Sequence, residues 1–326
     1  MKCTNKRRIA AVLFLALMIL PGCSQERLPF SYKQNNDVSA FQVASFNEEV
    51  KMAAFADVLC VGNANVTAGT SVDMTEASAA ALFDVNNRNI IYAKNMHERL
   101  YPASLTKVLT AVVALKNASP EDVITVTDGA KITESGATLC GLEPGDTLTM
   151  NQALHALLIC SANDAANAIA IHIAGSVDAF SAMMNEEAVS LGATNSNFVN
   201  PHGLSDDNHY TTAYDLYLIF NEAIQYEMFR EIVHMSSYET IYQNSQGEDK
   251  EMSFTTTNFF LRGEVSAPEK VTIIGGKTGT TNAAGNCLVL LSKDTAGNPY
   301  ISVILRAKER KIMYEEMVDM LEEIYN

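Results

Sequence analysis

Three short stretches of this chain carry residue types that together could break an acyl bond. Ser104-Leu105-Thr106-Lys107 supplies a hydroxyl and an amine, Ser161-Ala162-Asn163 a hydroxyl and a carboxamide, and Lys277-Thr278-Gly279 a cation and a hydroxyl. Residues three apart on a helix lie on one face, so Ser104 and Lys107 are expected to be within reach of each other. Together these groups could attack a carbonyl, relay a proton and hold a carboxylate.

The first stretch predicts a serine nucleophile with a lysine base. A serine hydroxyl is a poor nucleophile unless a neighbour takes its proton. Lys107 can do so only when neutral, and burial beside a second cation such as Lys277 would lower its pKa. A single S-x-x-K match is expected by chance in a chain of this length, and a capping serine before a surface lysine is the alternative. The otherwise apolar stripe that contains Lys107 favours a buried amine.

The second stretch is expected to serve proton transfer and positioning. Ser161 would pass a proton towards a leaving amine, and Asn163 would hold Lys107 and a substrate amide by hydrogen bonds. Taken alone, the two residues equally suit a loop serine and a helix cap. Their occurrence together with the other two stretches favours the catalytic interpretation.

The third stretch follows Gly275-Gly276 at the end of a predicted strand, whose edge could pair with an extended substrate. Lys277 and Thr278 are then expected to bind a terminal carboxylate. The N–H of Thr280 would join that of Ser104 in an oxyanion hole. A tight turn with an exposed lysine is the alternative.

The surrounding periodicity predicts the elements that position these residues. Residues 79–84 and 90–93 indicate a β-hairpin, and residues 103–116 a helix that is apolar on most sides. An Ala-rich helical region at 150–191 is broken at 160–162. Three strands and a last helix follow, at 271–274, 286–291, 300–305 and 311–325. This order predicts an α+β fold, in which an antiparallel sheet completed by distant parts of the chain is flanked by helices, with an inserted helical lobe.

Charge and cysteine content exclude several classes of function. The 326-residue chain has a net charge of −15, which argues against nucleic acid as a partner because phosphate binding needs clustered Lys and Arg. Neither the cysteines nor the six histidines fit a metal-binding template, so no metal and no other cofactor is expected. Of Cys60, Cys140, Cys160 and Cys287, the last two lie in apolar runs, which favours free thiols over disulfides.

The N-terminal region predicts export. Residues 1–22 combine a basic start with a 12-residue apolar run, Ile9 to Leu20, which is typical of a signal peptide. Leu20-Pro21-Gly22-Cys23 resembles a lipoprotein cleavage box, so Cys23 is the expected lipidation site; an ordinary secretory signal is the alternative. We expect a tether over 23–73 and a catalytic domain over 74–326, on the extracytoplasmic face of a bacterial membrane.

Five sequence blocks resemble one enzyme family over about residues 78–325. They are Pro102–Lys107, Gly141–Asp146, Ser161–Ala166, Asn200–Leu204 and Gly276–Thr280. The chain is similar there to the low-molecular-mass D-alanyl-D-alanine carboxypeptidases, serine peptidases of the penicillin-binding type. The resemblance implies a β-lactamase/DD-peptidase-like fold and an acyl-serine intermediate. It also implies removal of the terminal D-alanine from peptidoglycan stem peptides, with β-lactam antibiotics acylating the same serine.

The resemblance extends to residues without an obvious chemical step. His202 and Asp215 match family blocks and are expected to support the site from behind, although simple packing explains them equally well. Thr280 occupies a position that varies in the family. Many members continue into a β-rich domain and an anchoring helix, so lipid at Cys23 is expected to provide the membrane anchor here.

Two other functions share part of this residue pattern. A β-lactamase shares the three motifs but needs a base for deacylation, and Glu186, Glu187 and Glu222 do not lie in the expected sequence setting. The middle residue of the second motif, Ala162, also differs from the Asp or Tyr expected there. A non-hydrolytic penicillin sensor or wall-binding module would not need the complete set of serines and lysines.

Overall fold

The computed structural model describes residues 56, 58–67, 72 and 74–325. The predicted signal segment 1–22 and the predicted lipidation site Cys23 lie outside these residues, as does most of the predicted tether. Within the described part of the chain, no helix is both long enough and apolar enough to cross a membrane.

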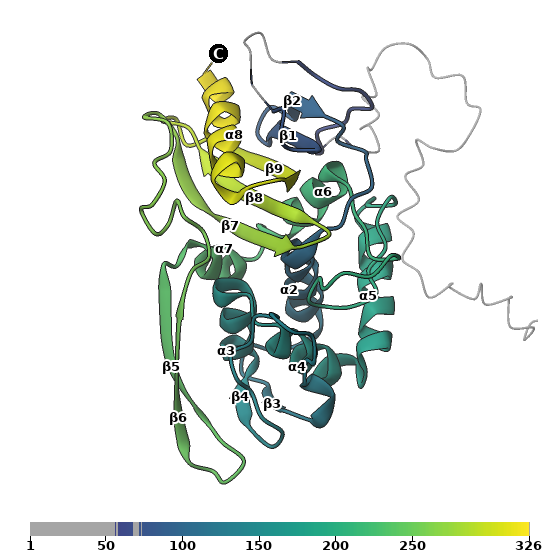
Figure 1. Ribbon diagram of the computed structural model, residues 1–326, viewed down its shortest axis with the longest axis vertical. Helices are drawn as coiled ribbons and strands as arrows, with labels where there is room; N and C mark the ends of the chain where they lie inside the picture. The colour runs from purple at the N-terminus through teal and green to yellow at the C-terminus, as the bar shows by residue number, and fades with distance from the viewer. Residues whose placement is uncertain (1–55, 57, 68–71, 73, 326) are drawn as a thin grey trace, which may run out of the picture. The chain divides into compact units, whose positions relative to one another are not determined.

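A five-stranded antiparallel sheet joins the beginning and the end of the described chain (Figure 1). Its order is β2-β1-β9-β8-β7, with bounds β1 Ala79–Asp84, β2 Asn89–Lys94, β7 Thr272–Thr281, β8 Gly285–Lys293 and β9 Pro299–Ala307. The β1–β2 hairpin is confirmed. Because β1 pairs with β9, the sheet is completed by distant segments, as predicted.

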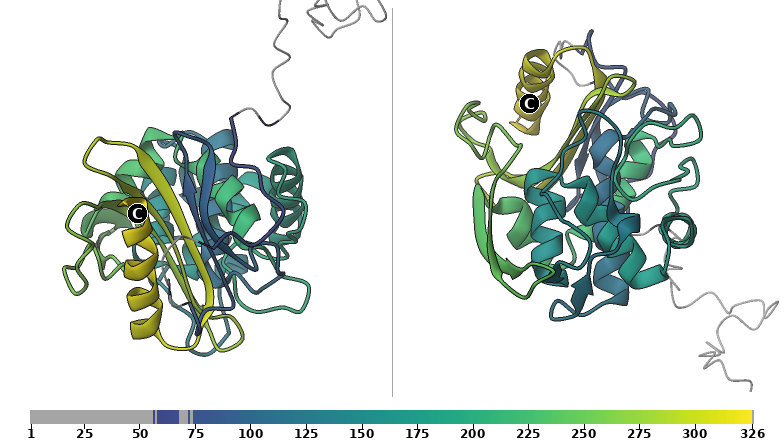
Figure 2. Two further views of the ribbon diagram at one scale, coloured as in Figure 1. Left: turned by 90° about the horizontal axis from the view of Figure 1, so that it is seen from above. Right: turned by 60° about the horizontal axis from the view of Figure 1, so that its bottom comes forward.

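The two faces of this sheet are buried against different partners. Along β8, Leu288 and Leu290 pack towards the last helix, α8 (Arg310–Glu322), while Val289 and Leu291 face the main core. This alternation is expected when successive side chains of a strand point to opposite faces. The right-hand view of Figure 2 shows α8 on one side of the sheet and the remaining helices on the other.

The helical lobe lies between β2 and β7 in the sequence. It contains α2 (Thr106–Asn117), α3 (Met150–His155), α4 (Asn163–Ala174), α5 (Val177–Ser190), α6 (Ala213–Ala223) and α7 (Glu227–His234). Every residue of α2 from Thr106 to Ala114 is buried, which explains why its sequence is apolar on most sides. The helical region at 150–191 and its break are confirmed, while α6 and α7 were not predicted.

The structure also contains a second sheet, which the sequence did not predict. It has the order β3-β4-β5-β6, with β3 Val123–Thr125, β4 Thr147–Thr149, β5 Ser237–Gln243 and β6 Asp249–Thr255. The first two strands are only three residues long, and most residues of the β5–β6 hairpin are exposed or half-buried. Such strands leave little apolar pattern in the sequence.

The prediction for β7 was wrong in one respect. The strand was expected to end before Lys277, but it continues to Thr281 and pairs with β8 down to Gly285. Gly275 suggested a strand end, yet it serves close packing, because a Cβ there would lie 2.3 Å from the carbonyl oxygen of Val233 on α7. Lys277 and Thr278 are therefore held within a paired strand.

Candidate active site

A strained turn presents Ser104 at the start of α2. Residues Ala103–Leu105 form a 3₁₀ turn, and Ala103 has φ 47°, a left-handed conformation that is unfavourable for a residue with a Cβ. Two glycines pack against this turn. A Cβ on Gly203 would lie 1.8 Å from the Ala103 carbonyl oxygen, and a Cβ on Gly279 would lie 2.9 Å from the Ser104 nitrogen. The sheet and the lobe thus fix the serine from two sides.

Lys107 is fully buried beside Ser104 and has three partners. Its Nζ lies 3.0 Å from Ser104 Oγ, 2.6 Å from Asn163 Oδ1 and 2.6 Å from the backbone oxygen of His202. The Asn163 and His202 oxygens can only accept hydrogen bonds. A neutral amine has two N–H groups for these two oxygens, which leaves its lone pair for the Ser104 hydroxyl proton. The arrangement suits a base next to a nucleophile.

Electrostatics favour that neutral form. Burial lowers the pKa of Lys107 well below its usual value, and the nearby Lys277 lowers it further, as predicted. Lys277 is also buried, which lowers its own pKa to about 7. The charge of Lys277 and the burial of Lys107 both favour a neutral amine beside Ser104.

Ser161 lies on the connection between α3 and α4, where the helix is interrupted. Residues Ala156–Cys160 form a π-helical turn, and Ser161 follows with φ 70° and ψ 35°. This left-handed conformation costs roughly 1–2 kcal/mol in a residue other than glycine. It leaves the Ser161 hydroxyl 2.9 Å from Lys277 Nζ, which donates to it. Strain is thus concentrated at a second serine of the same cluster.

The third stretch contributes from β7, an edge strand that pairs only with β8 within the described residues. Thr278 Oγ1 lies 2.5 Å from the hydroxyl of Thr257, which sequence reasoning did not identify. The hydroxyl of Thr280 donates to Asn286 Oδ1 on β8, at 3.2 Å. The three predicted stretches thus form one cluster, in which Ser104, Lys107 and Asn163 are connected by hydrogen bonds and Lys277 reaches Ser161.

His202 and Asp215 differ in how they relate to this cluster. His202 touches it through its backbone oxygen, and its ring Nδ1 accepts the N–H of Leu204. Asp215 accepts hydrogen bonds from Asn195 and Ser196 near the N-terminus of α6, and among the described residues it has no hydrogen bond to the cluster of Ser104, Lys107, Asn163, Ser161 and Lys277. Its contacts are those of a loop anchor.

The sequence did not predict a buried histidine behind the Ser104 turn. His209 Nδ1 accepts the N–H of Val199, so its Nε2 carries the proton and donates to Thr106 Oγ1 at 2.8 Å. Thr106 Oγ1 in turn donates to the oxygen of Ala103. Burial lowers the pKa of His209 to about 4 and keeps the ring neutral. Neither the distance of His209 from the three motifs in the sequence nor the residues next to it indicate a role for this histidine.

Carboxylates that could activate water lie elsewhere. Glu187 and Glu222 both bind Lys116, at 2.7 and 2.9 Å. Asp164, next to Asn163, accepts backbone N–H groups from Cys140 to Leu142. No carboxylate in the described part of the chain is hydrogen-bonded to Ser104, Lys107 or Ser161.

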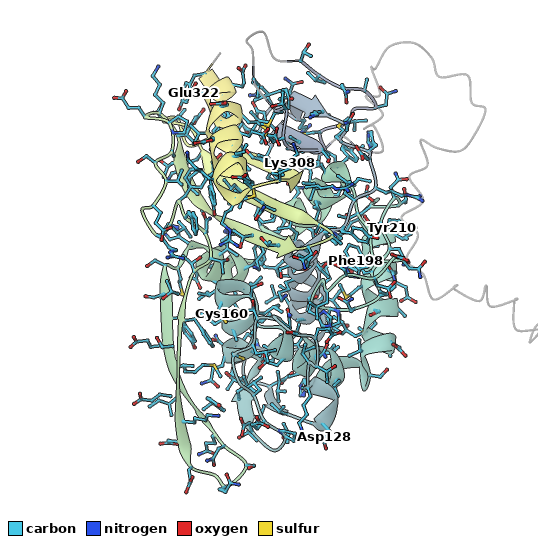
Figure 3. The ribbon with its side chains drawn as sticks, in the orientation of Figure 1. Asp128, Cys160, Phe198, Tyr210, Lys308 and Glu322 are labelled. Atoms are coloured by element: carbon cyan, nitrogen blue, oxygen red, sulfur yellow. The ribbon has the colours of Figure 1, made fainter. Side chains whose placement is uncertain are left out.

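Among the described residues, neither the cysteines nor a metal-binding group adds further chemistry to this site. Cys60, Cys140, Cys160 and Cys287 are all free thiols, and Cys160 is only partly buried. Figure 3 labels Cys160, which immediately precedes Ser161. Burial raises the pKa of its thiol to about 11, so it is protonated at neutral pH. Over the described ranges, no group of three or more potential ligands is arranged to hold a metal ion.

Comparison with known proteins places this chain in a family. A profile described as D-alanyl-D-alanine carboxypeptidase, peptidase family S11, matches residues 65–309. The chain belongs to this peptidase family. The D-alanyl-D-alanine carboxypeptidase DacF of Bacillus subtilis (strain 168) is 33% identical over 252 residues, which cover 75% of this chain and 61% of DacF. DacC of Escherichia coli (strain K12) is 32% identical, covering 76% of this chain and 60% of DacC. The chain thus spans about three fifths of these family members.

Solved structures agree with the S11 assignment at the level of the fold. The Streptomyces K15 DD-transpeptidase superposes with a TM-score of 0.71 at 25% identity, covering 79% of this chain and 98% of that one. A D-alanyl-D-alanine carboxypeptidase from Mycobacterium tuberculosis H37Rv gives 0.70 at 25% identity, with 81% and 96% covered. The predicted β-lactamase/DD-peptidase-like fold is confirmed.

Proposed function

We propose that this protein is a serine-type D-Ala-D-Ala carboxypeptidase, which removes the terminal D-alanine from peptidoglycan stem peptides and is acylated by β-lactams. The observation that carries the proposal is the environment of Lys107. A fully buried amine lies 3.0 Å from the Ser104 hydroxyl, and its other two partners are both acceptors. A protein that only bound peptide would have no need for such a base.

In the proposed acylation step, Lys107 takes the Ser104 proton while Oγ bonds to the carbonyl carbon of the penultimate D-alanine. The N–H groups of Ser104 and Thr280 stabilise the oxyanion. When the C–N bond breaks, Ser161 donates a proton to the departing amine. The proton that Lys107 took is then passed to Ser161, which leaves the Lys107 amine neutral again, while charged Lys277 holds the Ser161 hydroxyl in place. Water attacks the ester and yields a proton to Lys107, which returns that proton to Ser104 Oγ as the ester C–O bond breaks.

The substrate is proposed to bind along the free edge of β7 as an added strand. Its carboxylate is bound by Lys277 and Thr278, while Asn163 contacts the peptide amide. Gly275 packs tightly on α7, so the bound peptide extends the other way, past Thr280 towards the β7–β8 turn. This direction places the penultimate carbonyl next to Ser104, whose nitrogen lies directly against Gly279.

The test is release of D-alanine from a pentapeptide, run beside intact-mass detection of a penicilloyl adduct. The wild-type protein should release D-alanine and form a long-lived adduct at Ser104. Ser104→Ala should do neither, while Ser190→Ala, an exposed serine on α5, should behave as wild type. Rapid turnover of penicillin without D-alanine release would identify a β-lactamase instead. An adduct without release of D-alanine would identify a sensor.

We also propose that residues 1–22 are a signal peptide, that lipid on Cys23 anchors the protein outside the cytoplasmic membrane, and that 74–326 is the catalytic domain. The basic and apolar start of the chain and the Leu20–Cys23 box support this. Cys23→Ser should move the protein from the membrane fraction to the soluble fraction, whereas Cys3→Ser should not. A wild-type protein that is already soluble would contradict lipidation.

A further inference from the structure

A cavity lies near the end of β7, in the direction in which the proposed peptide path runs. It has a volume of about 650 Å³, and its walls come from residues 75–78, the loop after β2, the β7–β8 turn and the end of β9. Asn282 and Gly285 of the turn line it, only a few residues beyond Thr280. A strand advances about 3.3 Å per residue. A peptide bound along β7 would therefore bring the residue before the two D-alanines close to this opening.

The side chain of one cation in this cavity makes no hydrogen bond or ion pair with the described residues. Lys94 donates to the oxygens of Met74 and Ala77, and Lys308 forms an ion pair with Glu76 at 2.8 Å. Arg306 also lines the cavity, but its guanidinium has neither a hydrogen bond nor an ion pair within the described part of the chain. It is exposed, so it is available to a bound anion.

The backbone at Arg306 is strained. Leu305 and Arg306 of β9 lie opposite the single residue Cys287 of β8, which defines a β-bulge. Arg306 has φ 57°, a conformation for which glycine is the favoured residue. Bulges redirect side chains, and strain of this kind concentrates at functional sites. A contact between the Arg306 side chain and a bound ligand would offset the cost of this backbone conformation.

The bulge is also connected to the segment that carries the nucleophile. The N–H of Arg306 contacts Cys287 Sγ at 3.5 Å, and that sulfur lies 3.9 Å from the oxygen of Tyr101, three residues before Ser104. Figure 3 labels Lys308, two residues beyond Arg306, between the end of β9 and α8. Arg306 is thus attached to the same framework that fixes Ser104.

We propose that Arg306 binds a carboxylate of the stem peptide on the acyl side of the scissile bond, namely the side-chain carboxylate of a diaminopimelate-type third residue. Arginine presents a planar fork of donors that matches a carboxylate. Glu98, which lines the same cavity and has no side-chain partner among the described residues, would receive the amine of that side chain. A lysine-type third residue has the amine but no carboxylate. The inference rests on the proposed carboxypeptidase function.

The test compares three substrates of the form acetyl-X-D-Ala-D-Ala, in which X is diaminopimelate, its side-chain amide or lysine. Arg306→Gly is the informative variant, because glycine relieves the strain and should leave the melting temperature equal or higher. We expect kcat/KM for the diaminopimelate substrate to fall about tenfold or more, with less than about twofold change for the other two. Lys308→Gln, which changes a cation already paired with Glu76, should preserve the selectivity.

A second carboxylate source is tested with longer substrates that add a γ-linked glutamate before X, with its α-carboxylate free or amidated. One contrary result is that amidation of the glutamate alone lowers kcat/KM of wild type and that this effect disappears in Arg306→Gly. This pair of results would overturn the assignment to the third residue and would assign the glutamate carboxylate to Arg306 instead. Equal loss on all substrates, or no loss, overturns carboxylate binding by Arg306 while leaving the proposed function intact. Failure of wild type to release D-alanine from any substrate overturns both.

Discussion

Two buried lysines, Lys107 and Lys277, are expected to give the site its pH dependence. Lys107 must be neutral to act as a base, so kcat/KM is expected to fall at low pH as this amine is protonated. Lys277 must be charged to hold a carboxylate, and its pKa of about 7 predicts a second fall as the pH rises through that value. The pH profile of kcat/KM, measured on an acetylated peptide ending in D-Ala-D-Ala, should therefore be bell-shaped.

Lys277→Ala separates these two roles. Removing the neighbouring charge should raise the pKa of Lys107, so the acid limb of the profile moves to higher pH. The lost carboxylate contact should also lower kcat/KM by about tenfold to hundredfold, the equivalent of a charge-assisted hydrogen bond. Lys116→Ala, a lysine paired with Glu187 and Glu222, is the control. An unmoved acid limb would show that Lys277 does not influence the base.

His209 is expected to stabilise the nucleophile turn through Thr106. His209→Ala leaves the Val199 N–H without its buried acceptor, which should cost about 1–3 kcal/mol in chemical denaturation at pH 7. The folded-state pKa of about 4 lies below the ordinary histidine value near 6.5, so this part of the stability is present above about pH 6.5 and is lost as the pH falls towards 4.

The variant should accordingly lose less stability than wild type between pH 6.5 and 4. Slower penicillin acylation at pH 7 would accompany it, because Ala103 is then held less firmly. His172→Ala, an exposed histidine on α4, is the control and should change neither property. Parallel stability curves for His209→Ala and wild type would contradict the role given to the ring.

Among the helices, strands and loops, the sequence predicts which side chains form the site better than it predicts the backbone that positions them. The contacts of Lys107 with Ser104 and Asn163 were predicted because three residue types and their spacing define them. The contact with the His202 carbonyl was not, because any residue has a carbonyl and only the fold brings this one to the amine.

Local propensity explains the other misses. Gly275 and Gly276 reduce strand propensity, so β7 was predicted to end early, although pairing with β8 and packing on α7 carry it to Thr281. The left-handed backbone conformation of Ser161 could not be predicted, because serine is not a residue type that favours it. Tertiary contacts decide both features, and a sequence pattern does not contain them.

Gly203 allows its loop to pack closely against the turn that contains Ser104. Gly203→Ala should prevent normal packing of its loop on the nucleophile turn, because the new Cβ would lie 1.8 Å from the Ala103 oxygen and φ is +88°. Gly247→Ala is a matched control, with φ +78° and nothing within 4 Å. Both share the backbone strain of about 1–2 kcal/mol. Only Gly203→Ala should lower the unfolding free energy well beyond that and abolish penicillin acylation.

At the scale of the whole molecule, α8 completes the outer core of the sheet. Met317 is fully buried among Leu288, Leu290 and Ile304. Met317→Ala should lower the unfolding free energy by about 2–5 kcal/mol through lost burial and a residual cavity. Lys311→Ala, on an exposed part of the same helix, should change it by less than about 0.5 kcal/mol. Equal effects in denaturant titrations would contradict this role for α8.

The pairing of β1 with β9 also affects how the chain is made. Every residue of β1 is buried in the finished sheet, yet β9 begins more than 200 residues later. During synthesis or passage through a membrane, this apolar strand waits beside β2 with one edge unpaired until nearly the whole polypeptide has emerged. Exposed strand edges promote aggregation, and contacts distant in sequence form slowly. The sheet that packs against the Ser104 turn is therefore expected to form late and to expose an aggregation-prone edge until β9 is in place.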